Sequence, residues 1–256
     1  MTPPKLEAAA RVLSIVPKPA LPRIAPGAPA VFLLSICLLL TSAAGRAELK
    51  IEDEQWKRDY EKDGVVVYTR RFPASDFQAF KAVYTLDASI EDIMAVMSDP
   101  ASCTEWVLNC VESWGFDDKQ FAKRYAYSVN DLPWPVMDRD YVLEINTSKA
   151  PDSDTIVMDL YAVDHKVAPN KNYVRVNKQE THYHITPLGD EQTEIVWLQH
   201  TEPAGAIPSW LVNALIVDIP YKSLKALEKL ANSDKYQGYE VQYSEDGVIT
   251  GVEKQP

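Results

Sequence analysis

Two prolines flank Trp134 in the segment Asn130-Asp131-Leu132-Pro133-Trp134-Pro135, and they restrict the backbone more than any other feature of this chain. Proline fixes φ and has no N–H to donate, so neither a helix nor a central strand can pass through residues 133–135. The run Tyr141-Val142-Leu143-Glu144-Ile145 that follows is rich in strand-forming residues. The sequence therefore predicts a rigid loop that presents a large aromatic side chain beside a strand.

Arg139 lies between Asp138 and Asp140, at the point where this loop becomes the following strand. Hydrogen bonds between a guanidinium and a carboxylate are charge-assisted and therefore strong. We expect Arg139 and Asp140 to have a structural role, in which Arg139 braces the loop and does not contact a ligand.

Residues 1–47 have the pattern of a secretory signal: basic residues, the uncharged run 28–44, and small residues around Ala47. This pattern predicts export to the periplasm or secretion, followed by a domain over residues 48–235. A retained membrane anchor is the alternative, although the apolar part is shorter than the about 20 residues that a bilayer needs. The basic region is long for a signal, so the true start codon stays open.

The charge of the chain excludes some classes of partner. The chain carries 26 Lys and Arg against 37 Asp and Glu, a formal net charge of −11. Residues 1–47 hold five basic residues and one acidic residue, so the remainder has a net charge of −15. Such a field does not attract nucleic acid or anionic lipid head groups. We therefore expect no nucleic-acid partner, and we expect any membrane contact to be transient and apolar, or local to one basic patch.

Three cysteines are present, and Cys37 lies in the predicted signal. Cys103 and Cys110 remain, seven positions apart, and an oxidising compartment favours a disulfide between them. Two buried thiols are the alternative. The spacing does not fit a metal site, and no second cysteine or histidine cluster joins the pair, so we expect no metal.

The order of predicted elements indicates the fold class. Strands separated by turn signals, with one long amphipathic helix at the end, predict an α+β fold in which a curved antiparallel sheet grips that helix. Residues 236–256 are expected to be weakly structured. The predicted helices are 52–63, one capped by Ser89, a short one at Trp106, and 207–232 with a kink at Pro220; the predicted strands are 65–71, 77–88, 111–117, 121–130, 141–148, 155–164, 173–186 and 193–201.

Three motifs in this order resemble the START (StAR-related lipid-transfer) domain family of the exported bacterial type. They are 131–135 with 138–142, Trp-Val-Leu-Asn-Cys at 106–110, and Ile-Pro-Ser-Trp-Leu-Val-Asn at 207–213. The resemblance covers roughly residues 52–232. It implies a helix-grip fold whose internal tunnel binds one lipid or sterol-like hydrophobic molecule, with no cofactor and no covalent chemistry. The loop around Trp134 would form one lip, and the C-terminal helix the lid.

The resemblance and the apolar or aromatic character of the side chains select the residues expected at the cavity or its rim. For any single aromatic residue, an ordinary core position is the alternative. The expected residues are Tyr125, Tyr127, Trp134, Tyr141, Leu143, Met158, Leu160, Trp197, Trp210, Leu211 and Leu215.

One departure from the family concerns the ligand. Steroid-carrying members place an acidic and a basic residue inside the cavity, and the matching positions here fall near Ala126 and Ile145. The charged pair is therefore missing, which argues against a steroid held through such a pair. A register error of one residue would exchange the two faces and bring in Arg124 and Glu144 instead.

Two other functions remain open. The related polyketide cyclases and aromatases are enzymes, and His182 and His184 share one face of a predicted strand, where they could act as cavity acids or metal ligands. A periplasmic adaptor could instead use an exposed Trp134 and an apolar groove to bind a protein partner. We expect a monomeric carrier without enzymatic activity.

Overall fold

Alternating apolar and polar residues make strands the main regular structure of the described chain. The computed structural model describes residues 49–73 and 75–256, so the predicted signal at 1–47 lies outside the described residues. The strands are β1 Lys57–Lys62, β2 Val65–Arg71, β3 Gln78–Leu86, β4 Cys110–Gly115, β5 Lys123–Asn130, β6 Arg139–Lys149, β7 Ile156–Ala162, β8 Val174–Arg175, β9 Lys178–Gly189, β10 Gln192–Glu202, β11 Tyr239–Tyr243 and β12 Ile249–Lys254. The helices are α1 Ile90–Ser98, the 3₁₀ turn η1 Pro100–Ser102, α2 Cys103–Trp106, α3 Ser209–Leu215 and α4 Asp218–Ala231.

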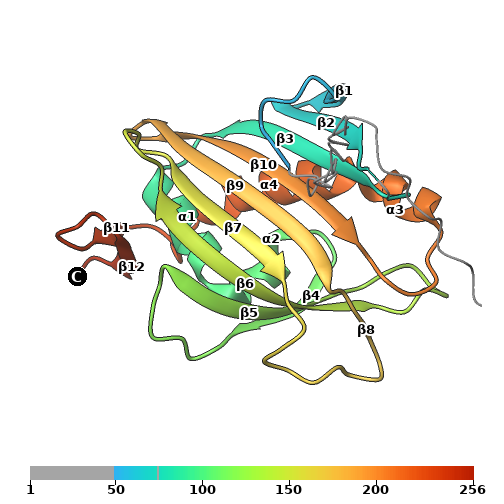
Figure 1. Ribbon diagram of the computed structural model, residues 1–256. Helices are drawn as coiled ribbons and strands as arrows, with labels where there is room; N and C mark the ends of the chain where they lie inside the picture. Colours follow the sequence, from blue (N-terminus) through green and yellow to red (C-terminus); the bar gives the residue numbers. More distant parts are fainter. Residues whose placement is uncertain (1–48, 74) are drawn as a thin grey trace, which may run out of the picture. The chain divides into compact units, whose positions relative to one another are not determined.

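One large sheet dominates the fold. Its strands follow the order β1-β2-β3-β10-β9-β7-β6-β5-β4, with antiparallel neighbours, and β8 pairs in parallel with β6. Figure 1 shows this sheet curving in front of the helices, with α4 behind β3 and β10. The structure confirms the predicted α+β helix-grip architecture.

Helix α4 buries one apolar stripe against the sheet. Leu224, Leu227 and Ala231 have no exposed surface, and their spacing of three and four residues places them on one helical face. Ser89 caps α1 as predicted, because its hydroxyl oxygen accepts a hydrogen bond from the backbone N–H of Asp92. No helix among the described residues is long and apolar enough to span a bilayer.

The prediction of a helix over 52–63 was wrong. Residues 57–62 form β1, which pairs with β2 through a tight hairpin. Asp63 and Gly64 both have positive φ, 48° and 81°, as a two-residue hairpin turn requires. The chain therefore turns between two strands at the position where the predicted helix would have ended.

The C-terminal helix is divided in two. Pro220 has no N–H, so it cannot donate to the carbonyl of Ile216, and the chain separates there into α3 and α4. Pro220 therefore lies in the first turn of α4, where the predicted single helix had only a kink. The predicted strand at 173–186 is divided as well, into β8 and β9.

Residues 236–256 were predicted to be weakly structured, and this was wrong. They contain the hairpin of β11 and β12, which is a separate two-stranded sheet. Tyr236 and Ile249 are 2% and 1% exposed and belong to the main hydrophobic core. The segment is short and rich in polar residues, so its sequence pattern does not indicate that Tyr236 and Ile249 are buried.

Candidate functional site

The concave face of the sheet and the helices enclose an apolar cavity of about 230 Å³. Alternate residues of β3, β5, β6, β7, β9 and β10 reach it, because successive side chains of a strand point to opposite faces. Six of the residues expected at the cavity or rim line it: Tyr141, Leu143, Met158, Leu160, Trp197 and Leu215.

Sequence reasoning missed several lining residues. Polar side chains on β3, β9 and β10 and three aromatic residues also reach the cavity. Those on β9 and β10 could have been identified from the alternation of inward residues around Trp197. The missed residues include Gln78, Phe80, Trp106, Gln179, Thr181, Tyr183, Gln199 and Thr201.

Tyr125 and Tyr127 do not line the cavity, which corrects the prediction. They lie on the outer face of β5, where the Tyr125 hydroxyl donates to Glu144 at 2.8 Å and Tyr127 packs in a separate apolar cluster. Their neighbour Ala126 lines the cavity instead, as does Ile145 on β6. The two positions that matched the charged pair of steroid carriers are therefore apolar and face inward.

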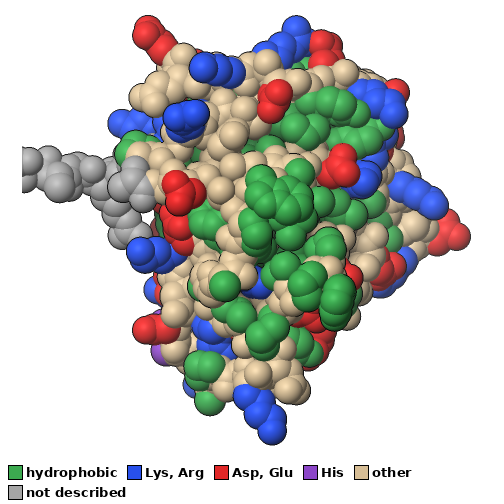
Figure 2. Space-filling view, turned by 90° about the vertical axis from the view of Figure 1, so that its right-hand side faces the viewer, with side chains coloured by type: hydrophobic (Ala, Val, Ile, Leu, Met, Phe, Trp, Pro, Cys, Tyr) green, Lys and Arg blue, Asp and Glu red, His purple; other side chains and the backbone are tan. Residues whose placement is uncertain are grey.

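Three other expected residues, Trp134, Trp210 and Leu211, lie outside the cavity, at the surface. Trp134 and Trp210 are 92% and 70% exposed. Figure 2 shows hydrophobic side chains gathered on this face, beside the loop between β5 and β6 and the start of α3. We call this surface the rim patch; it consists of Pro133, Trp134, Pro135, Val136, Met137, Ala206, Pro208, Trp210 and Leu211.

Arg139 connects two loops through backbone carbonyls. Its side chain is almost fully buried, and burial lowers its pKa. Nε donates to the carbonyl of Pro203 at 2.9 Å, Nη2 to that of Ala204 at 2.8 Å, and Nη1 to that of Met137. The carbonyls belong to the β5–β6 loop and to the connection between β10 and α3. The predicted carboxylates of Asp138 and Asp140 are not its partners.

Asp140 instead forms a buried ion pair with Arg175 of β8. Its Oδ2 lies 2.8 Å from Nη2 of Arg175 and accepts a hydrogen bond from the Tyr127 hydroxyl at 3.1 Å. Burial raises the pKa of Tyr127, with the Asp140 charge acting in the same direction. The pair fixes β8 to β6 on the outer face of the sheet, away from the cavity.

The two C-terminal helices are held very differently. α3 has no buried residue, and Asn213 ties it to the chain before β3: Oδ1 accepts from the Gln78 N–H at 3.1 Å, and Nδ2 donates to the Asp76 carbonyl at 3.4 Å. Since Val212 and Leu215 of α3 line the cavity, α3 is the weakly held part of its cover.

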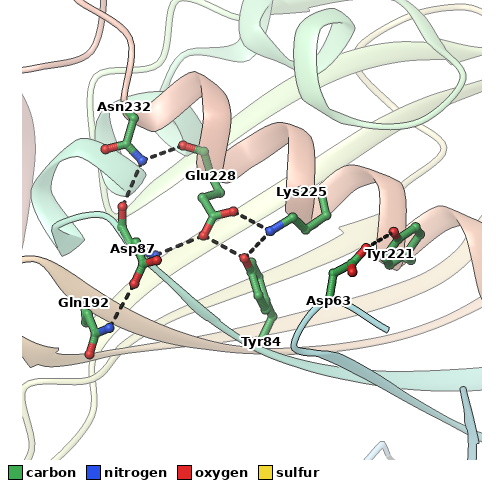
Figure 3. Close-up of polar contacts among 8 residues, drawn as sticks. All are labelled: Asp63, Tyr84, Asp87, Gln192, Tyr221, Lys225, Glu228 and Asn232. Atoms are coloured by element: carbon green, nitrogen blue, oxygen red, sulfur yellow. Dashed lines mark hydrogen bonds and ion pairs between the residues drawn. The ribbon is translucent and has the colours of Figure 1, made fainter. Parts of the chain in front are cut away.

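A polar network fixes α4 to the edge of β3 (Figure 3). Glu228 accepts from the Tyr84 hydroxyl at 2.7 Å and pairs with Lys225 at 2.6 Å. Asn232, just after α4, donates to the Asp87 carbonyl at 2.9 Å. Any lid movement that keeps these contacts must therefore be confined to α3.

His182 and His184 lie on the outer face of β9, so they do not act inside the cavity. Nδ1 of His182 is 2.7 Å from the Asp159 carboxylate. The inward positions of the strand belong to Thr181 and Tyr183. Within residues 49–73 and 75–256, no group of three or more His, Cys, Asp or Glu side chains is placed to hold a metal ion.

The lowered pKa of a buried histidine gives a pH prediction. His200 is 6% exposed and stacks on Phe72 at 3.8 Å between ring centroids, and burial lowers its pKa. In the unfolded chain this imidazole binds a proton near pH 6.5, whereas in the folded protein it does so only at a lower pH. The contribution of neutral His200 to the free energy of unfolding is therefore complete above about pH 6.5 and is lost as the pH falls through the lower folded pKa. We expect His200→Gln to reduce the loss of stability between about pH 7 and pH 5. Urea denaturation at both pH values measures it, and equal losses in both proteins would contradict it.

The disulfide between Cys103 and Cys110 is formed, as predicted, and joins α2 to β4 beside the cavity. Trp106, between the two cysteines, reaches the cavity lining. The disulfide therefore holds one wall of the site in place, through residues that are close in sequence.

Comparisons with known proteins agree with this geometry. The START domain model matches residues 43–233. An uncharacterized protein of Pseudomonas aeruginosa is 34% identical over 178 residues, covering 70% of this chain and 87% of that protein. START domain-containing protein 10 of Mus musculus is 25% identical over 204 residues, 73% of this chain and 69% of that protein.

Solved structures share the fold. The crystal structure of a STAR-related lipid transfer protein (fragment 25–204) from Xanthomonas axonopodis is 27% identical, with a TM-score of 0.65, and covers 70% of this chain and 100% of that one. Human STARD10 is 22% identical, with a TM-score of 0.63, over 71% of this chain and 74% of that one. Because the family model matches most of the chain, the protein belongs to the START-domain family of lipid-binding and lipid-transfer proteins.

Proposed function

We propose that this protein binds a single lipid or other hydrophobic molecule in its cavity and releases it unchanged. The observation that carries the proposal is the apolar cavity between the curved sheet and the C-terminal helices. Apolar cavities bind apolar ligands because the ligand leaves water. At 230 Å³ the cavity is smaller than the about 300–1,000 Å³ common for ligand pockets, so a bulky ligand requires α3 to move.

The polar lining gives no support to the alternative of a cyclase-like enzyme. Asp99 reaches the lining, but its carboxylate accepts hydrogen bonds from the Tyr236 hydroxyl at 2.7 Å and the Ala101 N–H at 3.0 Å. Arg139 is occupied by backbone carbonyls. Among the described residues, no histidine lines the cavity. General acid–base chemistry needs a titratable group that can exchange a proton with the substrate. Of the other titratable side chains in the lining, Asp131 is exposed, and burial raises the pKa of Tyr141 and of Tyr183, so both hydroxyls keep their protons.

Native mass spectrometry of the purified protein tests the carrier proposal. A co-purifying lipid, or a retained sterol after incubation, supports it, and extraction then identifies the ligand. An empty protein that converts an added polyketide-like substrate would overturn it in favour of an enzyme. An empty protein that instead forms a stable complex with a protein partner would favour the adaptor function.

Membrane contact through the rim patch is part of the proposal. Tryptophan is favoured where one side is apolar and the other wet, as at a bilayer surface. The net charge of −15 without residues 1–47 does not attract anionic lipid, so apolar contact must supply the affinity. The rim patch lies beside α3, so a bound membrane would be next to the proposed exit of the ligand.

Removing both exposed indoles should therefore weaken membrane binding. For Trp134→Ala/Trp210→Ala we expect about a hundredfold loss of affinity for neutral phosphatidylcholine vesicles, about tenfold for each partly inserted indole. Vesicle co-sedimentation measures it. Trp114→Ala is the control, because Trp114 is 38% exposed but lies on β4, outside the rim patch. Equal binding by the double variant and the wild type would exclude the rim patch as the contact.

Export of the protein is also proposed, with the periplasm or the exterior as its location. The charge and apolar pattern of residues 1–47 supports this, and a disulfide between Cys103 and Cys110 suits an oxidising compartment. Alkaline phosphatase fused after residue 48 should be active only if the segment directs export. An inactive fusion with intact protein in the cytoplasm would contradict export.

A further inference from the structure

The indole N–H of Trp197 is buried without a partner. The side chain is 2% exposed and lines the cavity, yet within the described part of the chain Nε1 has no hydrogen-bond partner. Folded proteins almost always pair such groups, because an unpaired buried donor is destabilising. An unpaired donor in the wall of a ligand cavity is explained if the ligand itself supplies the acceptor.

Tyr183 places a second donor next to this indole. It is the cross-strand neighbour of Trp197 on β9, with ring centroids 5.1 Å apart, and it also lines the cavity. Burial raises the pKa of its hydroxyl far above neutrality, so the group keeps its proton. The N–H of Trp197 and the O–H of Tyr183 therefore belong to the same part of the cavity wall.

The nearest comparable indole is already satisfied. Trp106 packs against Trp197 at 6.2 Å between centroids, but its Nε1 donates to the Ser102 hydroxyl at 3.2 Å. Other polar lining groups also bond to one another: Gln179 to Thr181 at 3.1 Å, and Gln199 to Thr201 at 3.3 Å. The indole N–H of Trp197 therefore lacks an acceptor while these neighbouring polar groups of the cavity have one.

The surroundings also limit the charge of the acceptor. Phe80 packs edge-to-face on Trp197 at 5.2 Å, and Ile145 and Met158 line the same cavity. The guanidinium of Arg139, the cation in the lining, is already bound to three carbonyls. A buried carboxylate or phosphate without a counter-charge is strongly disfavoured, whereas a neutral oxygen is not.

Resting on the proposed carrier function, we infer that Trp197 and Tyr183 form the hydrogen-bonding subsite for an uncharged oxygen of the ligand. The ligand class is an amphiphile with a hydroxyl, carbonyl or ether oxygen at the buried end. Its apolar remainder lies along Leu143, Leu160 and Leu215 towards α3. Fatty-acid anions are selected against because the cavity offers them no free counter-charge, and cationic amphiphiles because an ammonium group offers no acceptor to the two donors.

Chain-matched probes test this inference on the purified, delipidated protein. They are 1-octanol, octane, octanoate and octyltrimethylammonium; headspace gas chromatography measures the two volatile probes and calorimetry the two ions. We expect 1-octanol to bind at least about tenfold more tightly than either ion, and Trp197→Phe to weaken 1-octanol about tenfold while octane is unchanged. Tyr183→Phe should have a smaller effect in the same direction. Trp56→Phe, outside the cavity, should behave as wild type.

The outcomes separate the inference from the function on which it rests. If neither 1-octanol nor octane binds the wild type, the carrier proposal itself fails, and the subsite with it. If both bind and neither Trp197→Phe nor Tyr183→Phe changes the ratio of 1-octanol to octane affinity, the subsite alone is overturned. Octanoate binding as tightly as 1-octanol would overturn the uncharged class. Circular dichroism melting verifies that each phenylalanine variant is folded.

Discussion

Asp140→Ala should lower the free energy of unfolding by about 3–5 kcal/mol, because it leaves a buried guanidinium without its counter-charge. Asp140 is fully buried and Arg175 is 8% exposed, so water cannot replace the lost carboxylate. The Tyr127 hydroxyl loses its acceptor in the same variant. Urea denaturation followed by circular dichroism measures the change.

Two further variants test whether the loss of stability comes from the unpaired buried charge. Asp154→Ala removes an exposed pair with Lys149, whose distance is also 2.8 Å, and should cost less than about 1 kcal/mol. Asp140→Leu/Arg175→Met removes both buried charges and should be markedly more stable than Asp140→Ala, since no buried guanidinium is left without a counter-charge. A loss below about 1 kcal/mol for Asp140→Ala would show that the buried pair contributes little.

Local pattern was sufficient to predict the strands that carry the cavity. The prolines around Trp134 predicted the β5–β6 loop, and the resemblance together with apolar character selected Leu143 and Leu160, which line the cavity from β6 and β7. It failed on β5, where Tyr125 and Tyr127 were expected inside. The outer face there has its own apolar cover from Phe116, Val163, Val167 and Tyr173. An aromatic residue on a strand covered on both faces gives no information about which face is the cavity.

The remaining errors have one cause, which is that long-range contacts decide between local alternatives. Asp63-Gly64 suits a helix end or a hairpin turn, and pairing with β2 selects the turn. The unpaired N–H of Trp197 is likewise invisible in the sequence, because it depends on which atoms from distant strands fail to reach it.

Crosslinking α3 to the β5–β6 loop should slow ligand exchange about a hundredfold, because release would then require local unfolding that costs several kcal/mol. Met137 and Trp210 both belong to the rim patch, and cysteines at these positions can be joined by a bismaleimide. Cys103 and Cys110 are bonded to each other, so within the described residues the reagent has no competing thiol. Exchange of a fluorescent long-chain alcohol measures the rate, and the same variant with singly capped cysteines is the control.

The opposite change should open the lid, since α3 is held by few contacts. Asn213→Ala removes the two hydrogen bonds to Asp76 and Gln78 at the start of β3. At about 1 kcal/mol for each bond, it should speed exchange about thirtyfold. Asn232→Ala removes a similar amide bond that holds the end of α4, and should lower stability without changing the exchange rate.

If the crosslinked protein exchanges ligand at the wild-type rate, α3 is not the gate. If Asn232→Ala speeds exchange as much as Asn213→Ala, α3 and α4 move together, and the division of the helix at Pro220 has no role in release.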